Sequence, residues 1–197
     1  MSDLRYLAPG TLDEAVSAYA AAGSAARILA GGTDLLVQMR AGSVEPGLID
    51  DIKKIPEMTA SDETKDGGFH IGATVSGMTL HDHPRFGKVW PGILEGINLI
   101  GSKQVQGRCT MVGNLCNASP AADAVPPLVA AAAKVVIVGP KGKRTIPVEQ
   151  VPVAPGKTSL KKGEIIESIL LPKRPPRSGD AYLRFIPRTE MDIALGG

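Results

Sequence analysis

The chain has 197 residues, of which 43% are hydrophobic and 21% charged, and its formal net charge is +2. This length can bury a substantial core without disulfide bonds, and the composition is that of a globular protein rather than a disordered or fibrous one. Because the charges nearly balance and no basic cluster alternates with aromatic residues, the sequence lacks the electrostatic pattern of a nucleic-acid-binding protein.

The sequence shows no segment typical of membrane insertion or secretion. The longest apolar runs, at 128–133 and 135–138, are much shorter than the ~20 residues needed to cross a bilayer. The N-terminus has no apolar region after a basic start, so it does not resemble a signal peptide. We therefore expect a cytoplasmic protein without a transmembrane segment.

Residues 1–53 are predicted to form a small α/β unit. Thr11 and Glu14 make a capping box, and apolar residues then follow the helical period until Gly23, which predicts a helix over 11–23. A short strand, a glycine turn, another helix and a second strand are expected next, at 26–30, 31–32, 34–39 and 48–52.

Residues 54–175 mix the two periods and are predicted to form a larger α+β unit. Strands are expected at 69–73, 134–138, 144–148 and 164–171, and helices at 92–100 and 125–133. The second and third of these strands flank Gly139-Pro140-Lys141-Gly142 and should form a hairpin. The run 101–123 is polar, contains glycine and has no period, which predicts a long loop of the kind that is often functional. A linker and the start of a further domain are expected at 176–197.

The first candidate site is the run from Ile28 to Leu36, where a predicted strand passes through Gly31-Gly32 into a predicted helix. Small residues at such a turn let backbone N–H groups converge on an anion, and the helix N-terminus adds a favourable partial charge. This pattern fits both a turn that binds a diphosphate and an ordinary glycine turn without a ligand. The pattern is neither G-x-G-x-x-G nor a P-loop.

The second candidate site lies in the predicted loop, at residues 110–114 followed by 115–123. Its hydroxyls, amides and one carboxylate suit a polar ligand with hydroxyls and phosphates better than a proton-transfer reaction. A loop held together by its own Asx and Ser turns is the alternative.

The cysteines and histidines do not indicate a metal site. Cys109 and Cys116 are too few for an iron–sulfur cluster, which normally needs four thiolates, and are expected to be reduced thiols. His81 and His83 have no third candidate ligand nearby in the sequence and are expected in a solvated turn.

Taken together, these motifs resemble the FAD-binding medium subunit of molybdenum hydroxylases, the group that includes aerobic carbon monoxide dehydrogenase and bacterial xanthine dehydrogenase. The resemblance covers essentially the whole chain in the right order. It rests on the runs at 30–36, 39–42, 48–50, 71–73, 113–114, 118–123 and 192–194.

The resemblance implies an FAD-binding fold of the vanillyl-alcohol-oxidase or PCMH type, in which a small α/β subdomain and a larger α+β subdomain hold extended FAD between them. It places the diphosphate at 28–35, the flavin side at 110–114, the adenine end at Ile166 and a cofactor hydroxyl at Asp123. Arg184 stands where the family often has lysine. The cofactor-binding residues so implied are Ile28, Leu29, Ala30, Gly31, Gly32, Thr33, Asp34, Leu35, Thr110, Met111, Val112, Gly113, Asn114, Ala118, Ser119, Asp123, Ile166 and Arg184.

Two departures from the family pattern lead to expectations of their own. Val112 stands where the family has a glycine, and a β-branched residue would cost ~1 to 3 kcal/mol in strain if that glycine were needed for a positive φ or for close approach of the cofactor. The family also continues for another domain beyond the motif near Gly197, so we expect a truncated subunit with weaker FAD binding.

The resemblance implies an oxidoreductase subunit without catalytic residues of its own. It would pass electrons from iron–sulfur clusters of a 2Fe-2S small subunit through FAD to an external acceptor, while a molybdopterin-binding large subunit hydroxylates the substrate. A stand-alone flavin oxidoreductase of the same fold, and a non-catalytic nucleotide-binding or assembly module that has lost FAD, are the alternatives.

Overall fold

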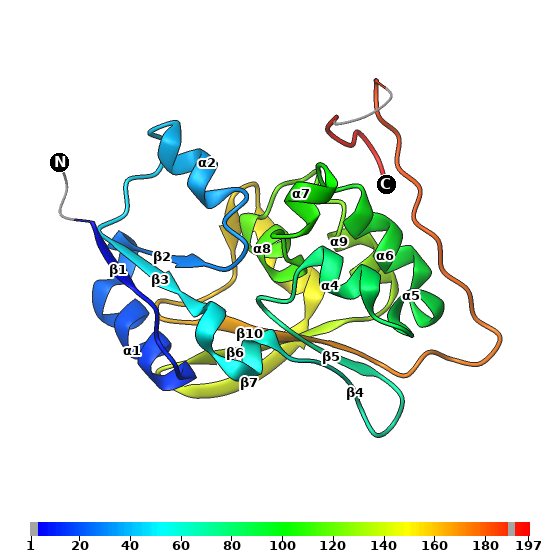
Figure 1. Cartoon of the computed structure of the whole chain (residues 1–197), viewed down its shortest axis with the longest axis horizontal. Coiled ribbons are helices and arrows are strands. Elements are labelled where there is room, and N and C mark those ends of the chain that lie inside the picture. Colours follow the sequence, from blue (N-terminus) through cyan, green and yellow to red (C-terminus); the bar gives the residue numbers. More distant parts are fainter. Residues whose placement is uncertain (1–3, 189–191) are drawn as a thin grey trace.

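The structure, a computed structural model that describes residues 4–188 and 192–197, is built around two main β-sheets (Figure 1). The smaller sheet is parallel. Its strand order is β1 (Arg5–Leu7), β3 (Leu48–Asp51), β2 (Ala26–Leu29). The larger sheet is antiparallel, in the order β4 (Ser61–Glu63), β5 (Phe69–Gly72), β10 (Ile165–Leu171), β6 (Lys134–Gly139), β7 (Gly142–Pro147). A short ribbon pairs β8 (Pro152–Ala154) with β9 (Lys157–Thr158).

Helices connect the two sheets and cover them. Helix α1 (Leu12–Ala22) contacts β2 and β3 of the smaller sheet and β6 of the larger one. Helix α2 (Leu35–Arg40) follows β2 directly. The others gather beside the larger sheet in Figure 1, and the short α3 contacts its strands β5 and β10. They are α3 (Pro56–Thr59), α4 (Gly77–Asp82), α5 (Phe86–Val89), α6 (Pro91–Asn98), α7 (Lys103–Gln106), α8 (Met111–Asn117) and α9 (Val125–Ala130), with 3-10 turns at Gly23–Ala25, Ile52–Lys54 and Val148–Gln150.

Helix α1 forms as its sequence predicts. The Thr11 hydroxyl accepts a hydrogen bond from the Glu14 N–H at 3.3 Å, and Gly23 ends the helix at φ +59°. Leu12, Ala15 and Val16 form its buried face. Because this face joins a core that also includes residues of β6 and β10, one helix ties the two sheets together.

The prediction of a long loop at 101–123 is wrong, because this segment contains the helices α7 and α8. Thr110 caps α8 by accepting a hydrogen bond from the Gly113 N–H at 2.9 Å, and Met111 and Leu115 bury its apolar side. Both helices are short, four and seven residues; α7 is mostly polar and α8 contains a glycine and two asparagines, so no helical period stands out in the sequence. Tertiary packing stabilises them.

The segment after β10 runs along the outside of α5 and α6 in Figure 1. It is fastened there by Arg174, which lies 5.1 Å from the Trp90 ring centre and pairs with Asp180. Asp180 in turn accepts a hydrogen bond from the Gly92 N–H at 2.8 Å.

The expected unit boundaries at residues 53 and 175 stay predictions. No described helix is long and apolar enough to cross a membrane.

Asp50 is a buried carboxyl in the middle of the smaller sheet. It is fully buried on β3, opposite Leu7 and Ile28, and neither of its oxygens has a hydrogen-bond partner among the described residues. Burial, reinforced by the charge of Asp51, raises the pKa of Asp50 to about 6 from its ordinary value of 3.8. Keeping this group charged at neutral pH therefore costs stability.

We expect Asp50→Val to stabilise the protein at pH 7 to 8 by at most ~3 kcal/mol. Between pH 3.8 and 6 the folded state holds a proton on Asp50 that the unfolded state has released, so parent stability should fall as pH rises through this window. Urea unfolding at several pH values measures this. Asp50→Asn is the control, because it should flatten the pH dependence but gain less, as its amide stays unpaired. A parent and valine variant with parallel pH profiles would contradict the assignment.

Candidate functional site

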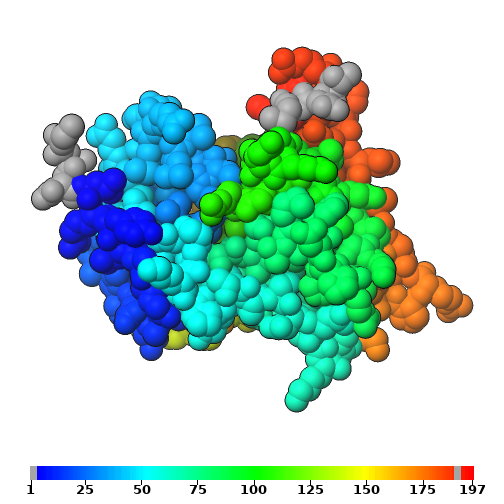
Figure 2. Space-filling model, in the orientation of Figure 1, coloured from blue at the N-terminus to red at the C-terminus, as the bar shows by residue number. Residues whose placement is uncertain are grey.

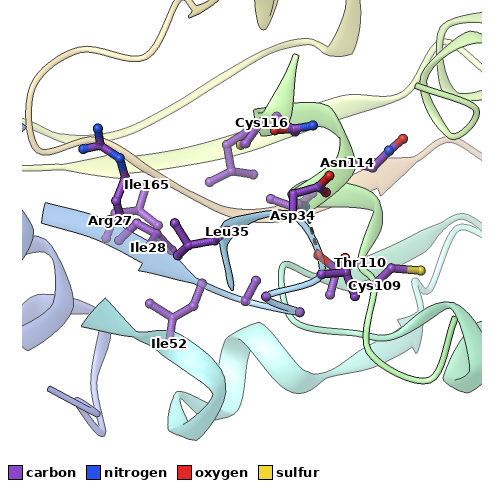
Figure 3. A pocket seen from close by; sticks show the side chains of 18 of the residues that line it. Arg27, Ile28, Asp34, Leu35, Ile52, Cys109, Thr110, Asn114, Cys116 and Ile165 are labelled. Atoms are coloured by element: carbon purple, nitrogen blue, oxygen red, sulfur yellow. Dashed lines mark hydrogen bonds between the residues drawn. The ribbon is translucent and has the colours of Figure 1, made fainter. Parts of the chain in front are cut away.

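A cavity of about 270 Å³ lies between the turn after β2 and the start of α8. Its walls include Ala30, residues 31–35, Thr110 and residues 112–114, so the structure brings together the two motifs singled out in the sequence. Figure 3 shows Leu35 and Asp34 on one side and Thr110 and Asn114 on the other. In Figure 2 the surface is hollowed between the light-blue segment that holds α2 and the bright-green segment around α7.

Two glycines allow the β2–α2 turn to approach the second motif. Gly32 has φ +76°, a conformation that side chains of L-residues rarely adopt. Gly31 lies directly against the backbone of the facing segment, since a Cβ at this position would come within 2.1 Å of the Arg108 carbonyl oxygen. The turn and the segment that leads to Thr110 are therefore in backbone contact, and this contact forms the floor of the cavity.

The turn presents unused hydrogen-bond donors. The backbone N–H groups of Gly32, Thr33, Asp34 and Leu35 have no acceptor among the described residues. Buried or partly buried N–H groups normally have a partner, so four successive donors beside a cavity are suited to bind an anion. Burial raises the pKa of the Asp34 carboxyl, whose side chain lies in the same wall.

Val112 lies in the first turn of α8, so the strain expected from a positive φ is wrong, whereas the expected crowding of a closely approaching cofactor stays a prediction. Its φ is not positive, because it adopts ordinary helical geometry, and its side chain is buried against the core while lining the cavity. A valine is compatible with this helical position. Compared with glycine, the valine side chain adds volume to the cavity wall and makes the cavity narrower at this point.

Hydrogen bonds between side chains and backbone fix the position of α8 relative to its neighbours. The Gln38 amide of α2 donates to the Asn117 side-chain oxygen at 3.1 Å, and the Asn114 side-chain oxygen accepts from the Ala124 N–H at 3.2 Å. These bonds tie α8 to both α2 and the start of α9. The cavity walls therefore belong to a connected structure.

A second cavity of about 270 Å³ adjoins the first, because Asp34, Ile100, Asn114 and Asn117 line both. Asp123, Ser119 and Arg184 line only this second cavity. The Asp123 carboxylate is engaged by protein groups: it accepts hydrogen bonds from the Tyr182 hydroxyl at 3.0 Å and from Arg184 at 2.7 Å. Binding of a cofactor hydroxyl by Asp123 stays a prediction.

Other predicted site residues lie in less direct places. Ile28 and Ile166 line the first cavity, whereas Leu29, Met111 and Ala118 line neither. Met111 belongs to the core, and Ala118 ends α8 at φ 49° and accepts a hydrogen bond from the Gly156 N–H. These three residues support the walls from behind.

The sequence interpretation missed several residues of the first cavity. The missed residues come from α1, β2, α2, the 3-10 turn after β3, the segment after α6, β9, the segment between β9 and β10, and the start of β10, and they are Tyr19, Arg27, Gln38, Ile52, Ile100, Thr158, Leu160, Glu164 and Ile165. Tyr19 belongs to the periodic face of α1 and Ile165 to an apolar strand. Their sequence patterns indicate core packing, so no local signal separates them from other core residues.

The two cysteines line the same cavity but are poor ligands for metals. Burial raises the pKa of the Cys116 thiol to about 12 and that of Cys109 above its usual value. Both are free, and both stay protonated at neutral pH, whereas metal ligation uses the thiolate. Across residues 4–188 and 192–197, no three potential ligands gather into a metal site.

The cavity fits the chemistry of a dinucleotide cofactor such as FAD. Four unpaired amides suit a diphosphate, isoleucines at 28, 52, 165 and 166 suit flat apolar rings, and Thr110 and Asn114 offer polar contacts. Fold and site together define an α+β domain whose cavity, between the β2–α2 turn and α8, has the donors and apolar walls that suit a phosphate-containing cofactor. The chain belongs to the family described as the FAD binding domain in molybdopterin dehydrogenase, which matches residues 2–174.

Known proteins agree with this family and with the fold. A xanthine dehydrogenase FAD-binding subunit from Escherichia coli O157:H7 is 30% identical over 173 residues, which are 87% of this chain and 59% of that subunit. The carbon monoxide dehydrogenase medium chain of Hydrogenophaga pseudoflava is 31% identical over 98% of this chain and 66% of its own length. A solved structure of carbon monoxide dehydrogenase from that organism superposes with a TM-score of 0.91 at 31% identity, covering 97% of this chain and 66% of that one.

These matches confirm the resemblance to FAD-binding medium subunits and the predicted fold class. FAD is the cofactor of the family. The chain spans 59 to 66% of the length of the relatives just described.

Proposed function

We propose that this chain is the FAD-binding part of an electron-transfer subunit of a molybdenum hydroxylase. The subunit takes electrons from iron–sulfur clusters of a partner 2Fe-2S subunit through bound FAD and delivers them to an external acceptor. Substrate oxidation belongs to a molybdopterin-binding large subunit. The observation that carries the proposal is the first cavity, which is lined by the β2–α2 turn with its four unpaired amides and by the N-terminal part of α8.

The chain's own residues bind and orient the cofactor. The amides of residues 32–35 are placed to hold the diphosphate, and the Gly31 contact with Arg108 keeps this turn next to α8. Thr110 and Asn114, which line the same cavity as Ile166, would then lie on the flavin side, and Ile166 would lie toward the adenine. Bound FAD supplies the redox chemistry, and the protein supplies position and electrostatics.

The relatives support the assignment of partners. The protein from Hydrogenophaga pseudoflava is a medium chain of carbon monoxide dehydrogenase, and the one from Escherichia coli is an FAD-binding subunit of xanthine dehydrogenase. By analogy, a molybdopterin-containing chain and a 2Fe-2S-containing chain should co-purify with this protein from its native source. Isolation as a lone yellow protein with oxidase or reductase activity would favour a stand-alone flavin oxidoreductase instead.

We expect the purified chain to bind FAD in a one-to-one complex, with the absorption bands of a bound flavin and a measurable dissociation constant. Titration followed by flavin fluorescence and by calorimetry tests this. Val112→Gly, which restores the family residue, should bind FAD more tightly by about tenfold, as one unfavourable contact is removed. A chain that binds no FAD, with or without Val112→Gly, would favour a module that has lost the cofactor and overturn the proposal.

A further inference from the structure

Strand β7 forms an open edge of the larger sheet. It stands last in the strand order and pairs with β6 on one side. Figure 1 shows it as the outermost strand at the lower side of this sheet. Because positions along an antiparallel pair alternate between hydrogen-bonded and non-hydrogen-bonded, every second residue of β7 turns its backbone N–H and C=O away from β6.

The register identifies Lys143 and Thr145 as the outward residues. The two-residue turn makes Gly142 a hydrogen-bonded position, and just past the other end of β7 the Val148 N–H donates to the facing segment at 3.0 Å. The positions between these two bonds alternate, so residues 143 and 145 face outward. Both are exposed, and in the part of the chain that the structure describes their N–H groups have no acceptor. The edge therefore offers free backbone donors and acceptors to another strand.

Basic side chains gather along this strand and in the loop beside its turn. Two contacts hold this loop, residues 161–164, against the hairpin. A Cβ added at Gly163 would lie 3.1 Å from the Pro140 Cγ, and Arg144 donates to the two Glu164 oxygens at 2.9 and 2.7 Å. We define the basic edge as Lys141, Lys143, Arg144, Lys161 and Lys162.

The acids of this region lie beneath the cations and already have partners. Glu164 and Glu167 are only 12% and 8% exposed and pair with Arg144 and Lys143. The other three lysines of the basic edge are exposed and, among the described residues, have no carboxylate within 4 Å. Five cations against two acids give an excess of three charges, whereas the whole chain carries +2. The outward potential of this edge is therefore positive.

A second copy of this chain is a poor partner for the edge. Pairing two β7 strands would place two basic edges side by side, and like charges at close range oppose such pairing. The opposite edge of the sheet, β4, is three residues long, and its Glu63 already pairs with Arg85 at 3.3 Å. A foreign strand that carries carboxylates matches both the open backbone and the charge.

We propose that β7 and the basic edge form a docking surface for an acidic, extended segment of another protein, which adds to the larger sheet as an outer strand. The backbone groups of Lys143 and Thr145 bind this segment, and the lysines attract its carboxylates. The inference is independent of cofactor binding, because no residue of the basic edge lines either cavity.

The probe is a synthetic peptide of about eight residues that alternates glutamate and threonine, since strands of this length are common. Calorimetry at low salt should show saturable binding to the parent chain, and the amides of Lys143 and Thr145 should be among those whose NMR signals shift most. Added salt should weaken binding, because exposed charge pairs are screened.

A triple variant tests the charges of the basic edge. Replacing its three unpaired lysines should lower peptide affinity by about 10-fold, because three exposed charge pairs are lost. The matched control replaces three exposed lysines elsewhere that form no salt bridge among the described residues, and it should stay within about twofold of the parent. The test variant is Lys141→Gln, Lys161→Gln, Lys162→Gln, and the control is Lys65→Gln, Lys88→Gln, Lys103→Gln.

Two further changes test the backbone of the edge. Thr145→Pro removes an outward N–H that makes no bond to β6, so thermal unfolding should still show a folded chain while peptide affinity falls by about 10-fold or more. The same peptide with N-methyl groups on alternate residues removes the donors from the ligand side, and its binding to the parent should weaken equally.

Absence of peptide binding to the parent overturns the inference. So does binding that survives both backbone changes, or an equal loss in the two triple variants. Binding of heparin or of phosphatidylserine vesicles without binding of the peptide also overturns it, in favour of a polyanion or a membrane surface. FAD affinity should be the same in all variants, so none of these results bears on the proposed function.

Discussion

Gly31→Ala should lower FAD affinity by at least about 100-fold, which corresponds to the loss of two charge-assisted hydrogen bonds. A Cβ on residue 31 would lie 2.1 Å from the Arg108 carbonyl oxygen, 2.9 Å from its carbonyl carbon and 3.1 Å from the Cys109 Cα. All three atoms belong to the backbone, so no side chain can rotate away. The two walls of the cavity must separate, and the amides of residues 32–35 then lose their position.

The same change should destabilise the fold by about 1 to 3 kcal/mol, the usual cost of overpacking. Gly47→Ala is the matched control: its added Cβ would lie 3.6 Å from that of Ala25, an ordinary contact, and Gly47 lines neither cavity. Flavin titration and urea unfolding of both variants measure the two effects separately. Tight FAD binding by Gly31→Ala would show that the diphosphate does not lie on this turn.

The sequence predicts the elements whose signals are local. The capping box of Thr11 and Glu14 and the regular apolar face of α1 locate that helix within a residue, and the turn at 139–142 locates the β6–β7 hairpin. Both are stabilised by contacts between residues close in sequence, so propensity and period agree with the final structure. Strand β10 is also found, because it is buried along nearly its whole length and five of its seven residues are isoleucine or leucine.

Elements that depend on distant contacts escape the sequence interpretation. Strand β1 is three exposed residues, and the strand it pairs with, β3, lies some forty positions later. Helix α8 has a capping threonine and two buried apolar residues one turn apart, Met111 and Leu115, but glycine and asparagine weaken the signal. Recognising the cap at Thr110 would have been enough to predict a helix there.

The residues of the candidate site also fall into two groups: those that a local sequence pattern indicates and those that only tertiary contacts bring to the site. The β2–α2 turn and the start of α8 carry unusual residue types, so both are visible in the sequence as candidate ligand contacts. Tyr19, Arg27 and Ile165 reach the cavity only because α1, β2 and β10 pack around it. Their positions follow from the tertiary arrangement, which a local pattern does not contain.

The pair formed by Asp123 and Arg184 should be the largest single contribution to the attachment of the C-terminal segment. The two side chains are 9% and 8% exposed and lie 2.7 Å apart, and the Tyr182 hydroxyl donates to the other Asp123 oxygen. That hydrogen bond and burial together raise the pKa of Tyr182 to about 12, so the phenol stays a donor. Because both oxygens of this carboxylate already have protein partners, the first role of Asp123 is structural.

Asp123→Ala should therefore reduce the free energy of unfolding by about 3 to 5 kcal/mol, because it leaves Arg184 buried without its counter-ion. Arg188→Ala is the control: Arg188 is 75% exposed in its pair with Asp192, and its loss should change stability by less than ~1 kcal/mol. The double variant Asp123→Ala with Arg184→Met removes both charges and should recover most of the loss. Urea unfolding of the four proteins decides the matter. If the double variant is as unstable as Asp123→Ala alone, the loss comes from the space and the Tyr182 contact that Asp123 provided, not from an uncompensated charge.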